Sequence, residues 1–165
     1  MNEYLVSLTS YNTWANSRIL NFVTAAGEER TSILQLSSFP TIRQTVLHIL
    51  DAQHIWYGRL HGISPADWPG KNFTDTTVDA CQRLIESSHD FQVYADSLSP
   101  SDLEKVITYH TIKGAVFQNT ITQIMVHVMN HGTFHRGQLI TMLRGAGHTD
   151  LASTDMIAYF RETGK

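Results

Sequence analysis

Apolar residues recur every three or four positions along four long segments of this 165-residue chain, a spacing that places them on one face of an α-helix. The first segment covers residues 3–25, and the second runs from Thr41, a good helix-capping residue, to Gly62. The third covers residues 76–97 and the fourth residues 118–144. The pattern predicts an all-α protein whose four helices bury their apolar faces against one another.

The segments between these helices carry other signals. Residues 63–73 contain two prolines and a glycine, so they form a connection long enough to lie across a pocket mouth, with Trp68 as its large side chain. Residues 103–117 are rich in β-branched and aromatic residues, which favours a short hairpin or extended excursion. A short C-terminal helix fits residues 154–161. We therefore expect a four-helix bundle with a long crossover.

Length and composition agree with one domain over residues 1–165. Hydrophobic residues make up 42% of the chain and charged residues 16%, and the sequence has no internal repeat or low-complexity tract. A chain of this length buries roughly two-thirds of the surface that its unfolded form exposes. One hydrophobic core, without disulfides, is therefore expected to be sufficient.

Charge and cysteine usage narrow the possible partners. The net charge is −3 and the lysines and arginines are scattered, so a nucleic-acid partner is not expected. Cys81, the single cysteine, lies on an apolar stripe and is expected to be a small buried hydrophobic residue. The chain shows neither a signal peptide nor an apolar run of about 18 residues, so we expect a cytoplasmic protein without a membrane partner.

The stretch HVMNHGTFHRGQL, residues 127–139, places three histidines four positions apart. At 100° per residue, His127, His131 and His135 share one stripe of the fourth helix with apolar residues at both ends, so the stripe is expected to face the core. Burying three imidazoles is costly unless their nitrogens have partners. A metal ion would supply such a partner.

Helix geometry limits which of these histidines can share one metal ion. Histidines at i and i+4 lie about 6 Å apart along the axis, from where both can reach an ion at about 2.0 to 2.1 Å. One ion can therefore bind His127 with His131, or His131 with His135. A third ligand must come from another helix, and His48, in the middle of the second helix, is the best candidate.

With these residues in view, the sequence resembles the DinB/YfiT family, bacterial four-helix-bundle proteins that include metalloenzymes and thiol-dependent S-transferases. The resemblance covers nearly the whole chain, and its markers are YNTWAN (11–16), LHILDAQHIWYGRL (47–60), NHGTFHRGQL (130–139) and DMIAYFRE (155–162). The family's metal triad maps onto His48, His131 and His135. The resemblance therefore implies which of the two histidine pairs binds the metal.

The resemblance also implies a chemistry. It implies one divalent metal ion, with zinc or nickel expected, and a low-molecular-weight thiol such as bacillithiol or mycothiol. The thiol would be transferred to an electrophilic small molecule through a metal-bound thiolate, or its adduct would be isomerised. A homodimer is also implied. Two alternatives stay open: a non-catalytic metal-binding stress protein, and a metal-dependent hydrolase using bound hydroxide. The histidine stripe carries no carboxylate to act as a general base, which disfavours hydrolysis.

Residues around the triad carry further expectations. Gln138 and Asp51, each one helical turn from a proposed ligand, are expected to hydrogen-bond it. His127 is expected to be a core histidine, and Arg136 to pair with a carboxylate rather than an anionic substrate. Close backbone packing is expected at Gly132 and Gly137, and a packing or hydrogen-bonding role at Asn130.

The remaining aromatic residues and histidines carry simpler expectations. Core or interface positions are expected for Trp14, Trp56 and Tyr57. Surface positions are expected for the other five histidines, His54, His61, His89, His110 and His148.

Overall fold

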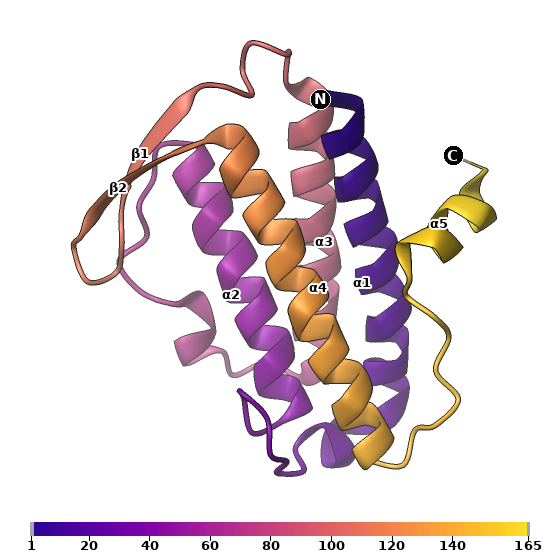
Figure 1. Ribbon diagram of the computed structural model, residues 1–165. Helices are drawn as coiled ribbons and strands as arrows, with labels where there is room; N and C mark the ends of the chain where they lie inside the picture. Colours follow the sequence, from indigo (N-terminus) through magenta and orange to yellow (C-terminus); the bar gives the residue numbers. More distant parts are fainter. Residues whose placement is uncertain (1, 165) are drawn as a thin grey trace.

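The four predicted long helices lie side by side in a bundle in the computed structural model, which describes residues 2–164 (Figure 1). The all-α four-helix bundle is therefore confirmed. The elements are α1 (Asn2–Thr31), α2 (Ile42–Leu60), the 3₁₀ helix η1 (Pro69–Asn72), α3 (Thr77–Ser97), β1 (Val106–His110), β2 (Val116–Thr120), α4 (Ile121–Gly145) and α5 (Met156–Thr163). None of the helices described is long and apolar enough to cross a membrane.

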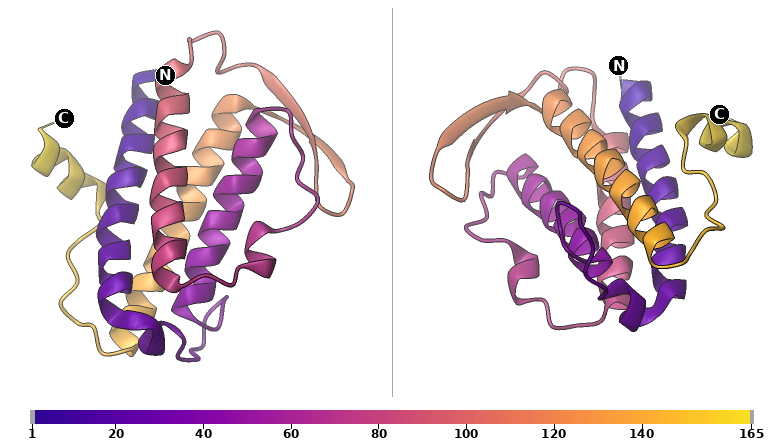
Figure 2. Two further views of the ribbon diagram at one scale, coloured as in Figure 1. Left: turned by 180° about the vertical axis from the view of Figure 1, so that it is seen from behind. Right: turned by 60° about the horizontal axis from the view of Figure 1, so that its bottom comes forward.

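The helices pack in a ring in which α1 and α2 are diagonal to each other. Helix α1 packs against α3 and α4, and α2 packs against the same two helices. The segment between α2 and α3 returns along the outside of the bundle, so these two helices run in the same direction (Figures 1 and 2). This is the predicted long crossover, and it leaves α2 and α4 as neighbours along their length.

Helix ends follow the capping residues of the sequence. Thr41 caps α2, and Thr76 and Thr120 begin α3 and α4 with reciprocal capping hydrogen bonds to Asp79 and Gln123. The first regular helix ends as predicted, because Gly27, two residues after the predicted segment 3–25, has a φ of 79° and interrupts α1. A further helical turn then continues to Thr31.

The predicted hairpin is present, but its second strand extends beyond the expected segment. Val106 pairs with Thr120 and His110 with Val116 in antiparallel register. Residues 118–120 therefore belong to β2, and α4 begins at Ile121 rather than at residue 118. Pairing with β1 satisfies the backbone groups that an earlier helix start would have used.

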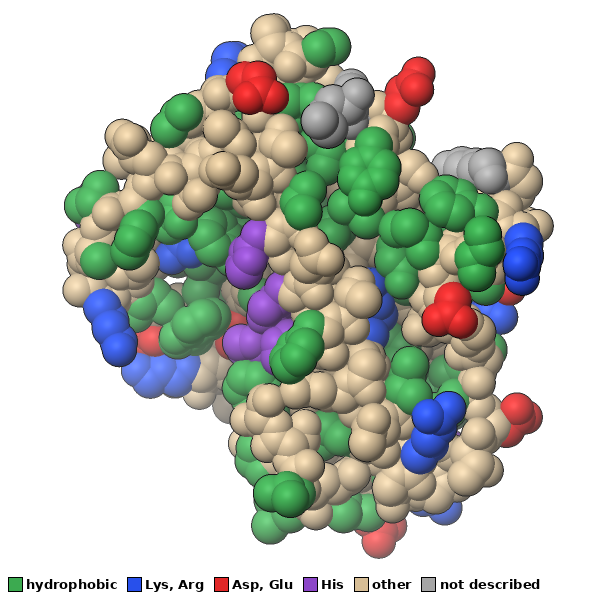
Figure 3. Space-filling view, viewed as in Figure 1, with side chains coloured by type: hydrophobic (Ala, Val, Ile, Leu, Met, Phe, Trp, Pro, Cys, Tyr) green, Lys and Arg blue, Asp and Glu red, His purple; other side chains and the backbone are tan. Residues whose placement is uncertain are grey.

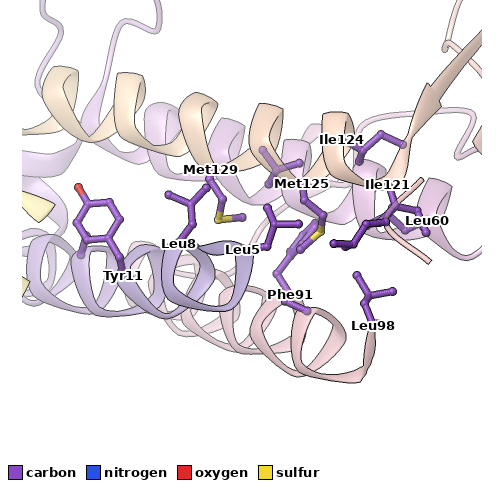
Figure 4. Close-up of a cluster of buried hydrophobic side chains, with 14 of the residues drawn as sticks. Leu5, Leu8, Tyr11, Leu60, Phe91, Leu98, Ile121, Ile124, Met125 and Met129 are labelled. Carbon is purple, nitrogen blue, oxygen red and sulfur yellow. The ribbon is translucent and has the colours of Figure 1, made fainter. Parts of the chain in front are cut away.

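The core lies between the helices in two clusters of buried apolar side chains. Figure 4 shows part of the first cluster, in which side chains from α1, α3 and α4 interdigitate. The residues labelled there are Leu5, Leu8, Tyr11, Leu60, Phe91, Leu98, Ile121, Ile124, Met125 and Met129. Cys81 belongs to the second cluster and is 3% exposed, as expected, and burial raises the pKa of its thiol to about 11.

Arg136 lies inside the bundle without a carboxylate, so the predicted salt bridge is wrong. The side chain is 2% exposed and donates to Asn12 Oδ1 at 2.6 Å, Asn16 Oδ1 at 2.8 Å and Thr133 Oγ1 at 2.7 Å. A Cβ on Gly132 would lie 3.0 Å from Asn12 Oδ1. The expected close approach at Gly132 is therefore made by side chains rather than by another backbone.

Two smaller expectations for α4 are also wrong. Gly137 is exposed, and a Cβ there would meet open space, so no close packing requires a glycine. Asn130 is likewise exposed, and no hydrogen bond joins its side chain to the described residues of α1 or α2. Both positions face away from the neighbouring helices.

Replacing Arg136 with methionine is expected to lower the free energy of unfolding by about 2–5 kcal/mol. The substitution leaves the oxygens of Asn12 and Asn16 buried without their donor. Urea unfolding measures the change, and Arg144→Met, at an exposed site on the same helix, is expected to shift stability by less than about 0.5 kcal/mol. If Arg136→Met and the wild type have the same free energy of unfolding, the expectation is contradicted. The free energy lost by dehydrating the guanidinium would then equal the free energy gained from its hydrogen bonds.

Candidate metal centre

Three histidines from α2 and α4 converge at the seam between these helices. The Nε2 atoms of His48 and His131 lie 3.0 Å apart, and the potential ligand nitrogens of His48, His131 and His135 all lie within 4.8 Å of one another. Of the two histidine pairs that helix geometry allows, the structure brings His131 and His135 together with His48. These three residues could hold a metal ion.

The helices themselves produce this convergence. His131 and His135 are one turn apart on α4, and their ring centroids lie 4.4 Å apart. His48, near the middle of α2, completes the group because α2 and α4 are neighbours. Its ring centroid lies 4.9 Å from that of His131 and 4.6 Å from that of His135.

Gln138 fixes the orientation of His135, as expected from its position one turn further along α4. Its Nε2 donates to Ser38 Oγ at 2.8 Å, so its Oε1 is the atom that faces His135 Nδ1 at 2.7 Å. His135 therefore carries its proton on Nδ1, and its Nε2 lone pair is free for an ion. An outer hydrogen bond of this kind is usual for metal-binding histidines.

Two aromatic side chains enclose His48. Phe39, in the connection before α2, stacks on its ring at a centroid distance of 4.1 Å and an interplanar angle of 27°. Trp68, in the crossover, lies 6.1 Å away. No sequence pattern indicates Phe39, since its contact with His48 depends on how the connection before α2 folds back. The expectation that the crossover lies beside a pocket is confirmed by Trp68.

Asp51 does not hydrogen-bond His48, so its expected role is wrong. Its carboxylate accepts the backbone N–H of Gly70, at the start of η1. A Cβ on Gly70 would lie 2.7 Å from Asp51 Oδ2, so any other residue there would displace this carboxylate. Asp51 thus positions the crossover segment that carries Trp68 rather than a candidate ligand.

Burial keeps the three imidazoles neutral. It lowers the pKa of His131 to about 3, with further lowering by the charges of His135, His48 and His127. Burial and then His135 lower the pKa of His48 to about 4. Burial also lowers the pKa of His135, while the hydrogen bond that His135 donates to Gln138 acts in the opposite direction. At neutral pH each ring therefore offers a lone pair without first losing a proton.

The donor set fits a divalent ion. Two nitrogens bound to a tetrahedral ion at about 2.0 Å lie about 3.3 Å apart, close to the 3.0 Å between the Nε2 atoms of His48 and His131. Three neutral histidines suit zinc, nickel, cobalt or iron, and three protein ligands leave a position open for another molecule.

An open cavity of about 520 Å³ adjoins the triad, a size typical of small-molecule sites. Figure 3 shows histidine side chains along the edge of a hollow on the face that carries the hairpin. His127 is exposed and lines this cavity, so its expected core position is wrong. Trp56, half-buried, also lines the cavity rather than only the core. No described residue of the cavity wall is an aspartate or glutamate.

Trp14 and Tyr57 pack on aromatic residues outside the triad. Trp14 packs on Tyr159 of α5 at a centroid distance of 5.7 Å, and Tyr57 packs on the core residue Phe91 at 5.4 Å. Of the five histidines expected at the surface, four are exposed and one, His148, is half-buried; the exposed four are His54, His61, His89 and His110.

The fold and the site together define a four-helix-bundle protein with a three-histidine group that could hold a metal ion. The chain belongs to the DinB family, whose model matches residues 1–163. It is 29% identical over 172 residues to Protein DinB of Bacillus subtilis (strain 168), covering 96% of this chain and 95% of that protein. A crystal structure of a DinB-like protein from Bacillus subtilis has the same fold, with a TM-score of 0.67, 16% identity, and coverage of 90% of this chain and 97% of that one.

Replacing Gln138 with leucine is expected to weaken metal binding about 10- to 100-fold, because His135 loses the acceptor that fixes its orientation. Competition titration with a chelating indicator measures the affinity. Gln138→Glu retains an acceptor oxygen and is expected to keep an affinity close to that of the wild type. An unchanged affinity in the leucine variant would contradict the role assigned to Gln138.

The metal-free protein is expected to lose stability as pH falls below about 6.5. The folded-state pKa values of His48 and His131 lie below the ordinary value of 6.5, so the unfolded chain binds more protons in this range. The contribution of these two neutral imidazoles to the free energy of unfolding is complete above pH 6.5. It is lost as the pH falls towards the folded-state pKa values of about 4 for His48 and about 3 for His131. Urea unfolding between pH 7.5 and 5 measures the loss. A shallower dependence is expected in the double variant His48→Gln, His131→Gln, and parallel curves would refute the assignment.

Proposed function

We propose that this protein is an enzyme that binds one divalent metal ion through His48, His131 and His135 and transfers a low-molecular-weight thiol to an electrophilic small molecule. The observation that carries the proposal is the convergence of three neutral imidazoles at an open cavity. A structural metal site is usually closed by four protein ligands, whereas three leave room for a reactant. Zinc and nickel are the metals we expect.

The chemistry supplied by the bound metal is a lowered pKa of a thiol that shares the site, so that a thiolate is available at neutral pH. In the overall reaction a carbon–sulfur bond forms, while the thiol proton and the leaving group of the electrophile depart. The family resemblance favours bacillithiol or mycothiol as the thiol. The residues of the chain hold and orient the reactants.

The cavity walls suit this division of roles. Ile55, Trp56 and Phe117 give the cavity a largely apolar lining, which would exclude water from the electrophile. Trp68 lines the same cavity and, together with Phe39, encloses His48. The lack of a carboxylate among the described wall residues disfavours hydrolysis, because activating water needs a general base within reach.

Metal content per chain is the first test of this proposal. Elemental analysis of untagged protein is expected to find about one equivalent of one divalent metal, since the triad forms a single three-ligand site. His131→Ala is expected to lose the metal and His127→Ala, one turn away on the same helix, to retain it. Full occupancy in His131→Ala would refute the assignment of the ligands.

The metal-loaded protein is then mixed with bacillithiol or mycothiol and 1-chloro-2,4-dinitrobenzene, and conjugate formation is followed by absorbance. We expect turnover that His131→Ala lacks and that His89→Ala, at an exposed position on α3 outside the cavity wall, retains. Metal binding without turnover for any combination of thiol and electrophile would instead support a non-catalytic metal-binding protein.

A further inference from the structure

Arg59, near the end of α2, is a buried cation in the cavity wall. The residue is 7% exposed, and its side chain lines the same cavity as His48 and His131. Burial lowers the pKa of its guanidinium, which nevertheless remains charged because arginine starts from so high a value. A charge in such a place is costly unless something compensates it.

Two aromatic rings hold the guanidinium in place. Its Cζ lies 4.4 Å from the ring centroid of Trp56 and 4.6 Å from that of Tyr109 in β1. Such contacts favour a cation at the ring faces and leave its N–H groups to point outward from its edges. The side chain is therefore preorganised, which reduces the entropy lost when it binds a ligand.

The hydrogen-bonding capacity of Arg59 is mostly unused within the described residues. Nη2 donates to the backbone carbonyl of His110 at 3.2 Å, while Nε is buried and has no acceptor among residues 2–164. Arg18 also has a buried Nε without an acceptor among these residues, but its Nη1 forms a salt bridge with Glu162. Arg83 forms a salt bridge with Asp75, and Arg136 donates to three side-chain oxygens. Of these arginines, Arg59 is the one that lines the cavity, where a ligand can supply the acceptor.

The surroundings of Arg59 are positive. Lys113, at the turn of the hairpin, lines the same cavity, and the described wall contains no acidic residue. His127 also lines this cavity, and its ring centroid lies 5.0 Å from that of Trp56 and 6.1 Å from that of His131. The positive charges of Arg59 and Lys113 contrast with the net charge of −3 of the whole chain. The cavity therefore favours an anion.

We propose that Arg59, assisted by Lys113, binds a carboxylate group of the small molecule that occupies the cavity. This inference rests on the proposed function. It means that one reactant is an anionic compound with an apolar body, whose carboxylate binds Arg59 while its reacting atom lies near the histidines. Eleven positions separate His48 and Arg59 on α2, about 16 Å of helix, so the ligand is extended. A planar guanidinium matches a carboxylate with two parallel hydrogen bonds.

The test compares 4-phenylbutyrate with its neutral isostere 4-phenylbutanamide by isothermal titration calorimetry. The protein is used as purified and, in parallel, after its metal has been removed by chelation. We expect the carboxylate to bind at least about tenfold more tightly than the amide in both forms, since hydrogen bonds to charged groups are the stronger ones. The metal-free arm separates this proposal from the proposed function, because it does not need the metal site.

Four variants test which residue causes the preference for the carboxylate over the amide. Arg59→Gln is expected to abolish it, Arg59→Lys to retain part of it, and Lys113→Gln to reduce it about two- to fivefold. Ser64→Ala is the matched control, because Ser64 Oγ accepts the His110 N–H and so also ties the hairpin to this region. It leaves the guanidinium in place and is expected to keep the preference. Thermal unfolding and circular dichroism verify that each variant is folded.

The results separate recognition by Arg59 from other causes. A preference that survives in Arg59→Gln, or that is absent in the wild type, overturns the proposal. A preference that disappears on metal removal overturns it too, because the carboxylate then binds the metal. Equal losses in Ser64→Ala and Arg59→Gln would leave Arg59 only a role in anchoring the hairpin, which also overturns it.

Discussion

The packing of α2 against α4 is the contact on which the candidate site depends. It brings His48 to within 3.0 Å of His131, and no single helix could supply three ligands to one ion. The ring arrangement creates this neighbourhood because the crossover lets α2 and α3 run parallel and leaves α1 and α2 diagonal. The same segment carries Trp68 to the cavity, so the connectivity that builds the bundle also builds the site.

Two buried arginines, Arg136 and Arg59, have no carboxylate partner, and their charges are stabilised in different ways. Arg136 lies in the bundle interior, where three side-chain oxygens from α1 and α4 accept its N–H groups. Arg59 lies in the cavity wall, where two aromatic rings and one carbonyl are its recorded partners. The first charge is neutralised by protein dipoles and stabilises the packing. The second retains capacity for a ligand, which agrees with its position beside open space.

The sequence pattern predicted the helices well because each depends on local information, namely apolar period and capping residues such as Thr41 and Thr120. It did less well where the partner is distant in sequence. The hydrogen bond of Gln138 to His135 could be predicted from one turn of helix, whereas Asp51, at similar spacing, bonds Gly70 instead. The pattern did not predict the hydrogen bonds of Arg136, because two of its acceptors, Asn12 and Asn16, lie more than 100 positions away in the sequence.

By itself, the sequence determined four amphipathic helices and a choice between two histidine pairs, since these follow from the 3.6-residue period and the 1.5 Å rise of a helix. It also determined a hairpin, from its dense β-branched and aromatic residues. The family resemblance indicated the pair His131 and His135. The tertiary structure decided how His48 from α2 joins this pair. Packing turned His127 towards the cavity, stacked Phe39 on His48, and buried Arg59 between two rings. These outcomes depend on which side chains from other elements fill the adjacent space, and helix periodicity carries no information about that.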